Sequence, residues 1–187
     1  MNKVFLTPMV IVLVVFMTVF TYGQESKMQT VAGVELQVYP TGVIPGVRYE
    51  VPISDRALLH LRAGYQFIDH RDLGKHDDET GSGYGFSLGY KRYLNAVQTK
   101  WSFMFKTDVW FNSIDWEGTE TDGSATGSTD IVVLQPTVQA EYDFMISERL
   151  ALSPSVAFGL EWNVKTEGSP TGEGPILLVG VALGYRL

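Results

Sequence analysis

The sequence contains no cysteine, and this absence excludes several ways of stabilising or anchoring a small protein. The chain can form neither a disulfide framework nor a metal site with thiolate ligands, and no lipid can be attached through an N-terminal cysteine. We therefore expect the fold to depend on packing and hydrogen bonding alone. At 187 residues with no shift in composition, the chain is expected to form a single domain after any targeting segment.

Positive charge is also scarce. Lys and Arg together number 14 against 21 Asp and Glu, and the formal net charge is −7. This acidic balance argues against nucleic acid as a partner, because nucleic-acid-binding surfaces are rich in lysine and arginine.

A long apolar run lies at the N-terminus. Met-Asn-Lys at residues 1–3 precedes an apolar run over 4–20, and the small residues Thr21 and Gly23 follow it. This order is typical of a signal peptide, so we predict cleavage after Gly23 and a mature domain over 24–187. The alternative is a retained membrane anchor, although the run is short for a spanning helix and is interrupted by Pro8.

Helical periodicity is absent after the N-terminal run. From Val31 onward, apolar residues recur at every second position, which predicts an all-β domain. The candidate strands cover 31–39, 43–52, 57–68, 83–93, 101–111, 131–144, 150–162 and 175–187. Most exceed the roughly 5 to 6 residues usual in globular proteins and approach the roughly 9 to 11 that a tilted strand needs to cross a bilayer.

Charged residues share one face of these strands. Of the twelve charged residues inside the candidate strands, eleven fall on the polar parity and only Arg92 does not; the eleven are Glu35, Arg48, Glu50, Arg62, Lys91, Lys106, Asp108, Glu141, Asp143, Glu161 and Arg186. Alternation alone does not say which face points inward, since a water-soluble barrel has its apolar face inside.

Three features favour the inverse, membrane-spanning arrangement. Aromatic residues of the apolar parity gather near strand ends, as in the interfacial girdles of membrane barrels. The short turns at 53–56 and 145–149 alternate with long loops at 69–82 and 112–130. Glycines such as Gly64 fall on the charged parity, where they would make room for large side chains in a narrow interior.

These features predict an eight-stranded antiparallel up-and-down transmembrane β-barrel, with one difficulty. Pro136 and Pro154 lie inside candidate strands, where a proline removes a ladder hydrogen bond. We expect a bulge or a strand end at each proline.

The chain resembles the small outer-membrane β-barrel proteins of the OmpA/OmpX type that lack a periplasmic domain. The resemblance rests on the N-terminal signal, the eight strands and the alternating C-terminal run Val179, Val181, Leu183, Tyr185, Leu187. It implies location in the bacterial outer membrane and insertion by the barrel-assembly machinery. That machinery usually reads a terminal aromatic residue in this family. Tyr185 fits the pattern, and the terminal Leu187 departs from it.

The inward charges form the candidate functional site. In an interior too narrow to hydrate them, buried charges must pair or be neutralised. We expect ion pairs in the lumen among Arg48, Glu50, Arg62, Lys106, Asp108 and Glu141. The functional alternative is a narrow gated channel whose ion pairs rearrange.

No catalytic, cofactor or metal site is expected. Some small outer-membrane barrels modify lipid A, which requires a Ser or His placed at the lipid face or barrel mouth, but His60 falls on the inward parity. The acidic residues of the long loops are scattered among Gly, Ser and Thr, so a solvated surface is expected rather than a calcium site. These acids include Asp77, Asp78, Glu79, Asp115, Glu117, Glu120, Asp122 and Asp130.

The function expected from the sequence is a structural or surface-interaction role in the outer membrane. The expected partners are outer-membrane lipid and lipopolysaccharide, and the chain is expected to be a monomer. A narrow porin-like channel and a lipid-A-modifying enzyme are the two alternatives.

Overall fold

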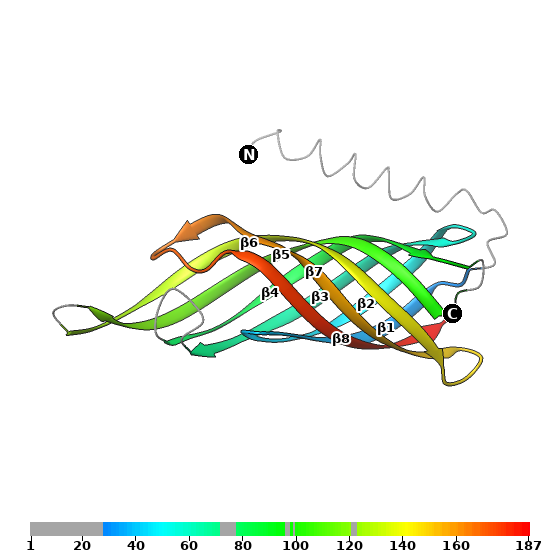
Figure 1. The fold of residues 1–187 in the computed structure, drawn as a ribbon, viewed down its shortest axis with the longest axis horizontal. Helices are drawn as coiled ribbons and strands as arrows, with labels where there is room; N and C mark the ends of the chain where they lie inside the picture. Colours follow the sequence, from blue (N-terminus) through cyan, green and yellow to red (C-terminus); the bar gives the residue numbers. More distant parts are fainter. Residues whose placement is uncertain (1–27, 72–77, 96–97, 99, 121–122) are drawn as a thin grey trace, which may run out of the picture.

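The structure is a computed structural model that describes residues 28–71, 78–95, 98, 100–120 and 123–187. Eight antiparallel strands form a closed barrel in sequence order (Figure 1). They are β1 (Val31–Tyr39), β2 (Gly42–Ser54), β3 (Ala57–Arg71), β4 (Asp78–Tyr93), β5 (Lys100–Glu120), β6 (Gly123–Met145), β7 (Leu150–Glu167) and β8 (Gly174–Arg186). Pairing of β1 with β8, in which Val31 lies opposite Arg186, closes the ring. The predicted all-β, eight-stranded up-and-down barrel is confirmed.

The predicted signal peptide, residues 1–23, lies outside the described residues. Within the part of the chain that the structure describes, no helix has the length and apolar character that a membrane span requires.

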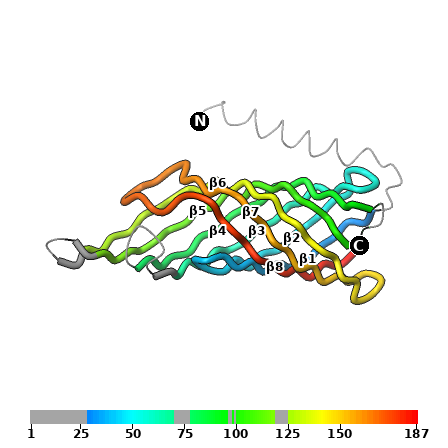
Figure 2. The backbone as a smooth tube through the Cα atoms, in the orientation of Figure 1, coloured from blue at the N-terminus to red at the C-terminus, as the bar shows by residue number. Residues whose placement is uncertain are grey.

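The two ends of the barrel differ. At the terminal end, where β1 begins and β8 ends, Leu187 donates its backbone N–H to the carbonyl oxygen of Thr30. At the opposite, distal end, the hairpin of β5 and β6 projects beyond the other strands (Figure 2). Its pairing continues as far as Glu120 opposite Gly123.

The prediction of long loops at 69–82 and 112–130 is therefore partly wrong. Most of the segments 69–82 and 112–130 continue the strand ladders, and β3 pairs with β4 as far as Arg71 opposite Asp78. Alternation of apolar and polar residues fades in these segments because both faces meet water beyond the apolar belt, so the period-2 pattern could not mark their strands.

The expectation of a bulge or strand end at the two prolines is wrong. Both prolines lie inside continuous strands. Pro136 on β6 lies opposite Thr107 on β5, and Pro154 on β7 lies opposite Val181 on β8. Neither takes part in a described pair between β6 and β7, and the register of that ladder is the same on both sides of each. Both prolines interrupt the ladder between β6 and β7, and neither adds a residue to its strand. The missing N–H groups therefore do not shift the pairing of the two strands.

Side chains alternate between a buried interior and an exposed exterior. On β5, the side chain of Phe105 is exposed, with a relative accessibility of 57%, whereas that of Lys106 is fully buried. The outward residues of β8 from Leu177 to Tyr185, and Leu187 just after the strand, are all exposed and apolar or aromatic. Charges inside and apolar groups outside are the reverse of a water-soluble barrel.

Candidate functional site

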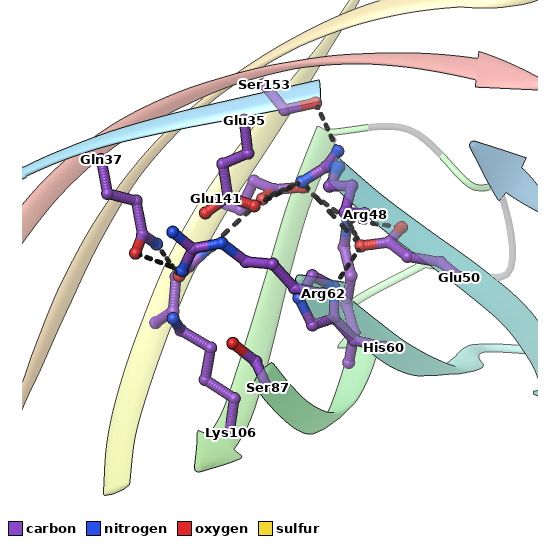
Figure 3. A network of polar contacts seen from close by, with 12 residues as sticks. Glu35, Gln37, Arg48, Glu50, His60, Arg62, Ser87, Lys106, Glu141 and Ser153 are labelled. Atoms are coloured by element: carbon purple, nitrogen blue, oxygen red, sulfur yellow. Dashed lines mark hydrogen bonds and ion pairs between the residues drawn. The ribbon is translucent and has the colours of Figure 1, made fainter. Parts of the chain in front are cut away.

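The candidate site is the barrel interior, and its first part is an ionic cluster in the half nearer the terminal end (Figure 3). Nη1 of Arg48, on β2, lies 2.9 Å from Oε2 of Glu141 on β6. The same nitrogen lies 3.8 Å from Glu35 and 3.9 Å from Glu50. A single guanidinium thus faces three carboxylates from β1, β2 and β6.

Lys91 supplies the second cation of this cluster. Its Nζ lies 2.5 Å from Oε1 of Glu141 and 3.3 Å from Oε2 of Glu50. Nδ1 of His60 lies 3.0 Å from Oε1 of Glu50, so that carboxylate has partners from three strands. All these side chains are buried, and their mutual pairing offsets the cost of removing them from water.

A second ionic group lies beside the first and is centred on Asp108. Nζ of Lys106 lies 2.9 Å from Oδ2 of Asp108, and Nη1 of Arg62 lies 3.7 Å from Oδ1. The hydroxyl of Ser87 also donates a hydrogen bond to Asp108. Arg62 in addition donates to Oε1 of Gln37 at 2.7 Å, which links this group to β1.

The structure thus divides the six site residues expected from the sequence between two groups. Arg48, Glu50 and Glu141 meet in the ionic cluster, and Arg62, Lys106 and Asp108 form the second group. Sequence reasoning placed Lys91 on the inward face but did not include it among the pairing residues. No pattern in one sequence indicates which of several inward cations reaches a given carboxylate, since this depends on the stagger between strands.

The distal half of the interior contains a large apolar cluster, which sequence reasoning did not predict, beside the buried polar side chains of Gln66, Glu79 and Asn112. This cluster of buried residues is here called the apolar layer: Tyr39, Ile44, Ile68, Trp110, Ile114, Ile131, Val133, Ala157, Ile176 and Leu178. Trp110 joins it to the polar half, because Arg62 lies 5.6 Å from the centre of its ring. The available signal was pairs of adjacent apolar residues, such as Ile176-Leu177, which break the alternation.

The terminal end of the interior is covered as well. Met28, Leu58 and Tyr93 form a small buried cluster there. The side chain of Gln98 accepts a hydrogen bond from the backbone N–H of Gln29 at 2.7 Å and donates one to its carbonyl at 2.8 Å. The interior therefore consists of a covered terminal end, two ionic groups and an apolar layer.

Outside the interior, acidic side chains lie on the projecting strands of the distal end. Asp115, Glu117 and Asp130 are exposed on β5 and β6. Over the described ranges, no group of three or more His, Asp or Glu side chains is arranged to hold a metal ion. Asp77 and Asp122 lie outside the described residues.

Comparison with known proteins identifies similar structures but no relatives by sequence. No protein-family model matches the chain, and no curated protein matches it. A major outer membrane protein from Thermus thermophilus is 16% identical, with a TM-score of 0.51 over 86% of this chain and 100% of that chain. Neisserial surface protein A is 10% identical, with a TM-score of 0.48 over 85% and 95% of the two chains.

The attachment invasion locus protein of Yersinia pestis, Ail, is also similar in structure, at 9% identity and a TM-score of 0.48 over 85% of this chain and 97% of that chain. The match to the Thermus protein, which spans that chain in full, carries the comparison. The chain has the fold of the small outer-membrane β-barrels.

Proposed function

We propose that the protein resides in the bacterial outer membrane and has a structural or surface-interaction role there. The observation that carries this proposal is the exposed apolar exterior around the whole ring. Phe86 on β4, Phe105 on β5 and Phe158 on β7 are each more than half exposed. A water-soluble monomer rarely exposes a large continuous apolar surface, whereas hydrocarbon suits such a surface.

The closed interior favours a structural role over transport. The buried cations and carboxylates are held by opposite charges, and the apolar layer occupies the distal half. An apolar constriction resists the entry of water and ions. A porin-like channel would require both the ion pairs and the apolar layer to rearrange.

The position of His60 argues against a lipid-modifying enzyme. Such an enzyme needs its reactive group at the lipid face or the barrel mouth, where an acyl chain can reach it. His60 is fully buried in the terminal half, with Nδ1 3.0 Å from Glu50. Its role is better explained as part of the ionic cluster.

The two surfaces of the barrel suggest its partners. The apolar belt would contact outer-membrane lipid, and the projecting acidic strands would meet lipopolysaccharide, through divalent ions, or other macromolecules at the cell surface. The last strand, with Tyr185 and Leu187 outward, would be read by the barrel-assembly machinery during insertion of a monomer.

Membrane fractionation combined with gel mobility tests this proposal. The protein should sediment with the outer membrane and migrate differently in SDS before and after boiling, because a closed membrane barrel resists SDS until it is heated. A soluble protein with identical mobility in the two samples would contradict the proposal.

A further inference from the structure

A cavity of about 300 Å³ lies at the distal mouth of the lumen and is lined in part by residues of the apolar layer. Every strand except β2 contributes to its lining, together with the connection between β7 and β8. Its volume lies at the lower end of the range for small-molecule sites, which is about 300 to 1,000 Å³. The cavity plays no part in closing the barrel and is distinct from the two ionic groups.

The walls of the cavity are largely apolar. Ile68, Ile114, Ile131 and Ile176 project into it from four different strands, and the ring of Tyr39 completes this lining. A bound molecule would gain by removing apolar surface from water here. The site therefore suits a compact apolar group rather than a sugar or another fully polar molecule.

The charged groups of the cavity are all acidic. Glu79, Glu161 and Glu173 line it, and none of the described lining residues is Lys or Arg. Oε2 of Glu161 accepts a hydrogen bond from Nε2 of Gln135 at 3.1 Å, a neutral donor that leaves the carboxylate charge uncompensated. An anion would be repelled from such a site, whereas a cation would be attracted.

Asn112 provides an independent indication of a missing donor. This residue lines the cavity, is only 6% exposed, and its Oδ1 accepts no hydrogen bond. Its Nδ2 donates to Oε1 of Gln66 at 3.1 Å, and Gln66 in turn donates to the hydroxyl of Tyr39. A buried acceptor without a partner costs free energy that a ligand N–H would recover.

We propose that the distal cavity binds a small organic cation, an ammonium group attached to a compact apolar body. The ammonium would donate to the acceptors of the rim, with Glu161 as its counter-charge, and the apolar body would pack against the isoleucines. A bare metal ion fits less well, since over the described residues no acidic group has the arrangement of a metal site. The inference does not depend on the proposed membrane role.

Benzylammonium is a suitable test ligand, with benzyl alcohol as its neutral counterpart. The full mature protein, folded in micelles, would carry ¹³C-labelled isoleucine δ1 methyl groups. Titration should shift the methyl signals of the cavity, including those of Ile131 and Ile176, whereas the signal of Ile53, which is exposed near the terminal end, should stay unchanged. Benzyl alcohol should bind about 10-fold more weakly or worse, because it lacks the charge-assisted hydrogen bond.

Two variants and a matched control separate the contributions. Glu161→Gln keeps the shape of the side chain and an acceptor for Gln135, and should weaken benzylammonium binding about 10-fold. Glu167→Gln removes one carboxylate from the same strand, outside the cavity, and should leave binding unchanged. Gly172→Leu fills the cavity where an added Cβ meets nothing within 4 Å, and should also reduce binding.

Retained heat-modifiable mobility and methyl spectra would show that each variant is folded. Equal binding of benzylammonium and benzyl alcohol would overturn the proposal, as would equal effects of the Glu161 and Glu167 substitutions. If Glu161→Gln failed to fold, unchanged affinity in Gly172→Leu would still overturn it.

Discussion

Arg48 and Arg62 lie directly opposite each other on β2 and β3, yet their guanidinium groups belong to different ionic groups. Nη1 of Arg48 is 2.9 Å from Glu141, whereas Nη1 of Arg62 is 3.7 Å from Asp108. Two adjacent cations on one inner face would repel each other strongly in an interior of low dielectric constant. Turning toward different carboxylates relieves this repulsion, so each arginine can be tested separately.

Replacement of Arg48 should be strongly destabilising. Arg48→Met keeps much of the side-chain volume but removes the cation described beside Glu35 and leaves Glu50 and Glu141 to share Lys91. Breaking a buried pair on one side costs about 3 to 5 kcal/mol. Urea unfolding in lipid vesicles would measure this loss. As a control, Lys165→Met removes a cation from an exposed pair with Glu167 and should leave the midpoint unchanged.

Replacement of Arg62 should cost less than replacement of Arg48. In Arg62→Met, Asp108 retains Lys106 at 2.9 Å and the hydroxyl of Ser87, so its charge remains compensated. The unfolding midpoint should fall, but by less than in Arg48→Met. A neutral effect, together with folding in aqueous buffer without lipid, would indicate that the charged face meets water and would reverse the inside-outside assignment.

The sequence was sufficient to predict the barrel because alternation is strongest where one face of a strand meets an apolar surrounding. The bounds of β1 were predicted correctly at both ends. At the terminal end of the barrel, the start of β3, the end of β4 and the start of β7 also coincide with the predicted bounds. The distal continuation of β5 to Glu120 could not be predicted, since neither face of its last residues is consistently apolar there.

The interior could be predicted only in part. Parity places Arg48 and Glu141 on the inner faces, but the contact between them depends on the register of the five strands from β2 to β6. The apolar layer was not predicted because its inward residues adjoin outward apolar residues, as Ile44 adjoins Val43. Two adjacent apolar residues interrupt the period-2 pattern, so the pattern does not show which of them points inward. In a barrel this narrow, a pair of adjacent apolar residues marks a place where the inward side chain is apolar as well as the outward one.

The outward belt can be tested at Phe105, which lies between Trp101 and Phe111 on β5. Phe105→Arg should destabilise the barrel in lipid vesicles by about 2 to 4 kcal/mol, as expected for an arginine near the bilayer midplane. Phe105→Leu keeps an apolar side chain and serves as the control. Equal stability of the two variants would mean that this position does not face hydrocarbon.

Gly85 and Trp110 are opposite each other on β4 and β5, and the glycine leaves space for the indole ring. A Cβ added at Gly85 would collide with that ring. Gly85→Val should therefore destabilise the barrel by about 1 to 3 kcal/mol through overpacking. In the double variant with Trp110→Leu, the added cost of the valine should fall but not disappear, because the added Cβ would still meet the backbone carbonyl oxygen of Val109. A double-mutant cycle of unfolding measurements would detect this decrease.

The last prediction concerns conduction through the apolar layer. Trp110 is the largest fully buried side chain among the described residues and lies where the polar and apolar halves meet. The unmodified protein should show only small or rare currents in planar bilayers, because its interior is filled by side chains. Trp110→Ala should open more often, although the lost packing costs about 3 to 5 kcal/mol and folding must be checked by gel mobility.

Phe111→Ala is the matched control for conduction, since Phe111 is the next residue on β5 but points outward. It should leave the currents unchanged, because the substitution removes a ring from the lipid face and not from the lumen. Equal currents in the two variants would mean that the apolar layer is not the barrier. Large, stable currents in the unmodified protein would contradict a closed interior altogether and favour the porin-like alternative, because ions would then cross both the apolar layer and the ion pairs without a substitution.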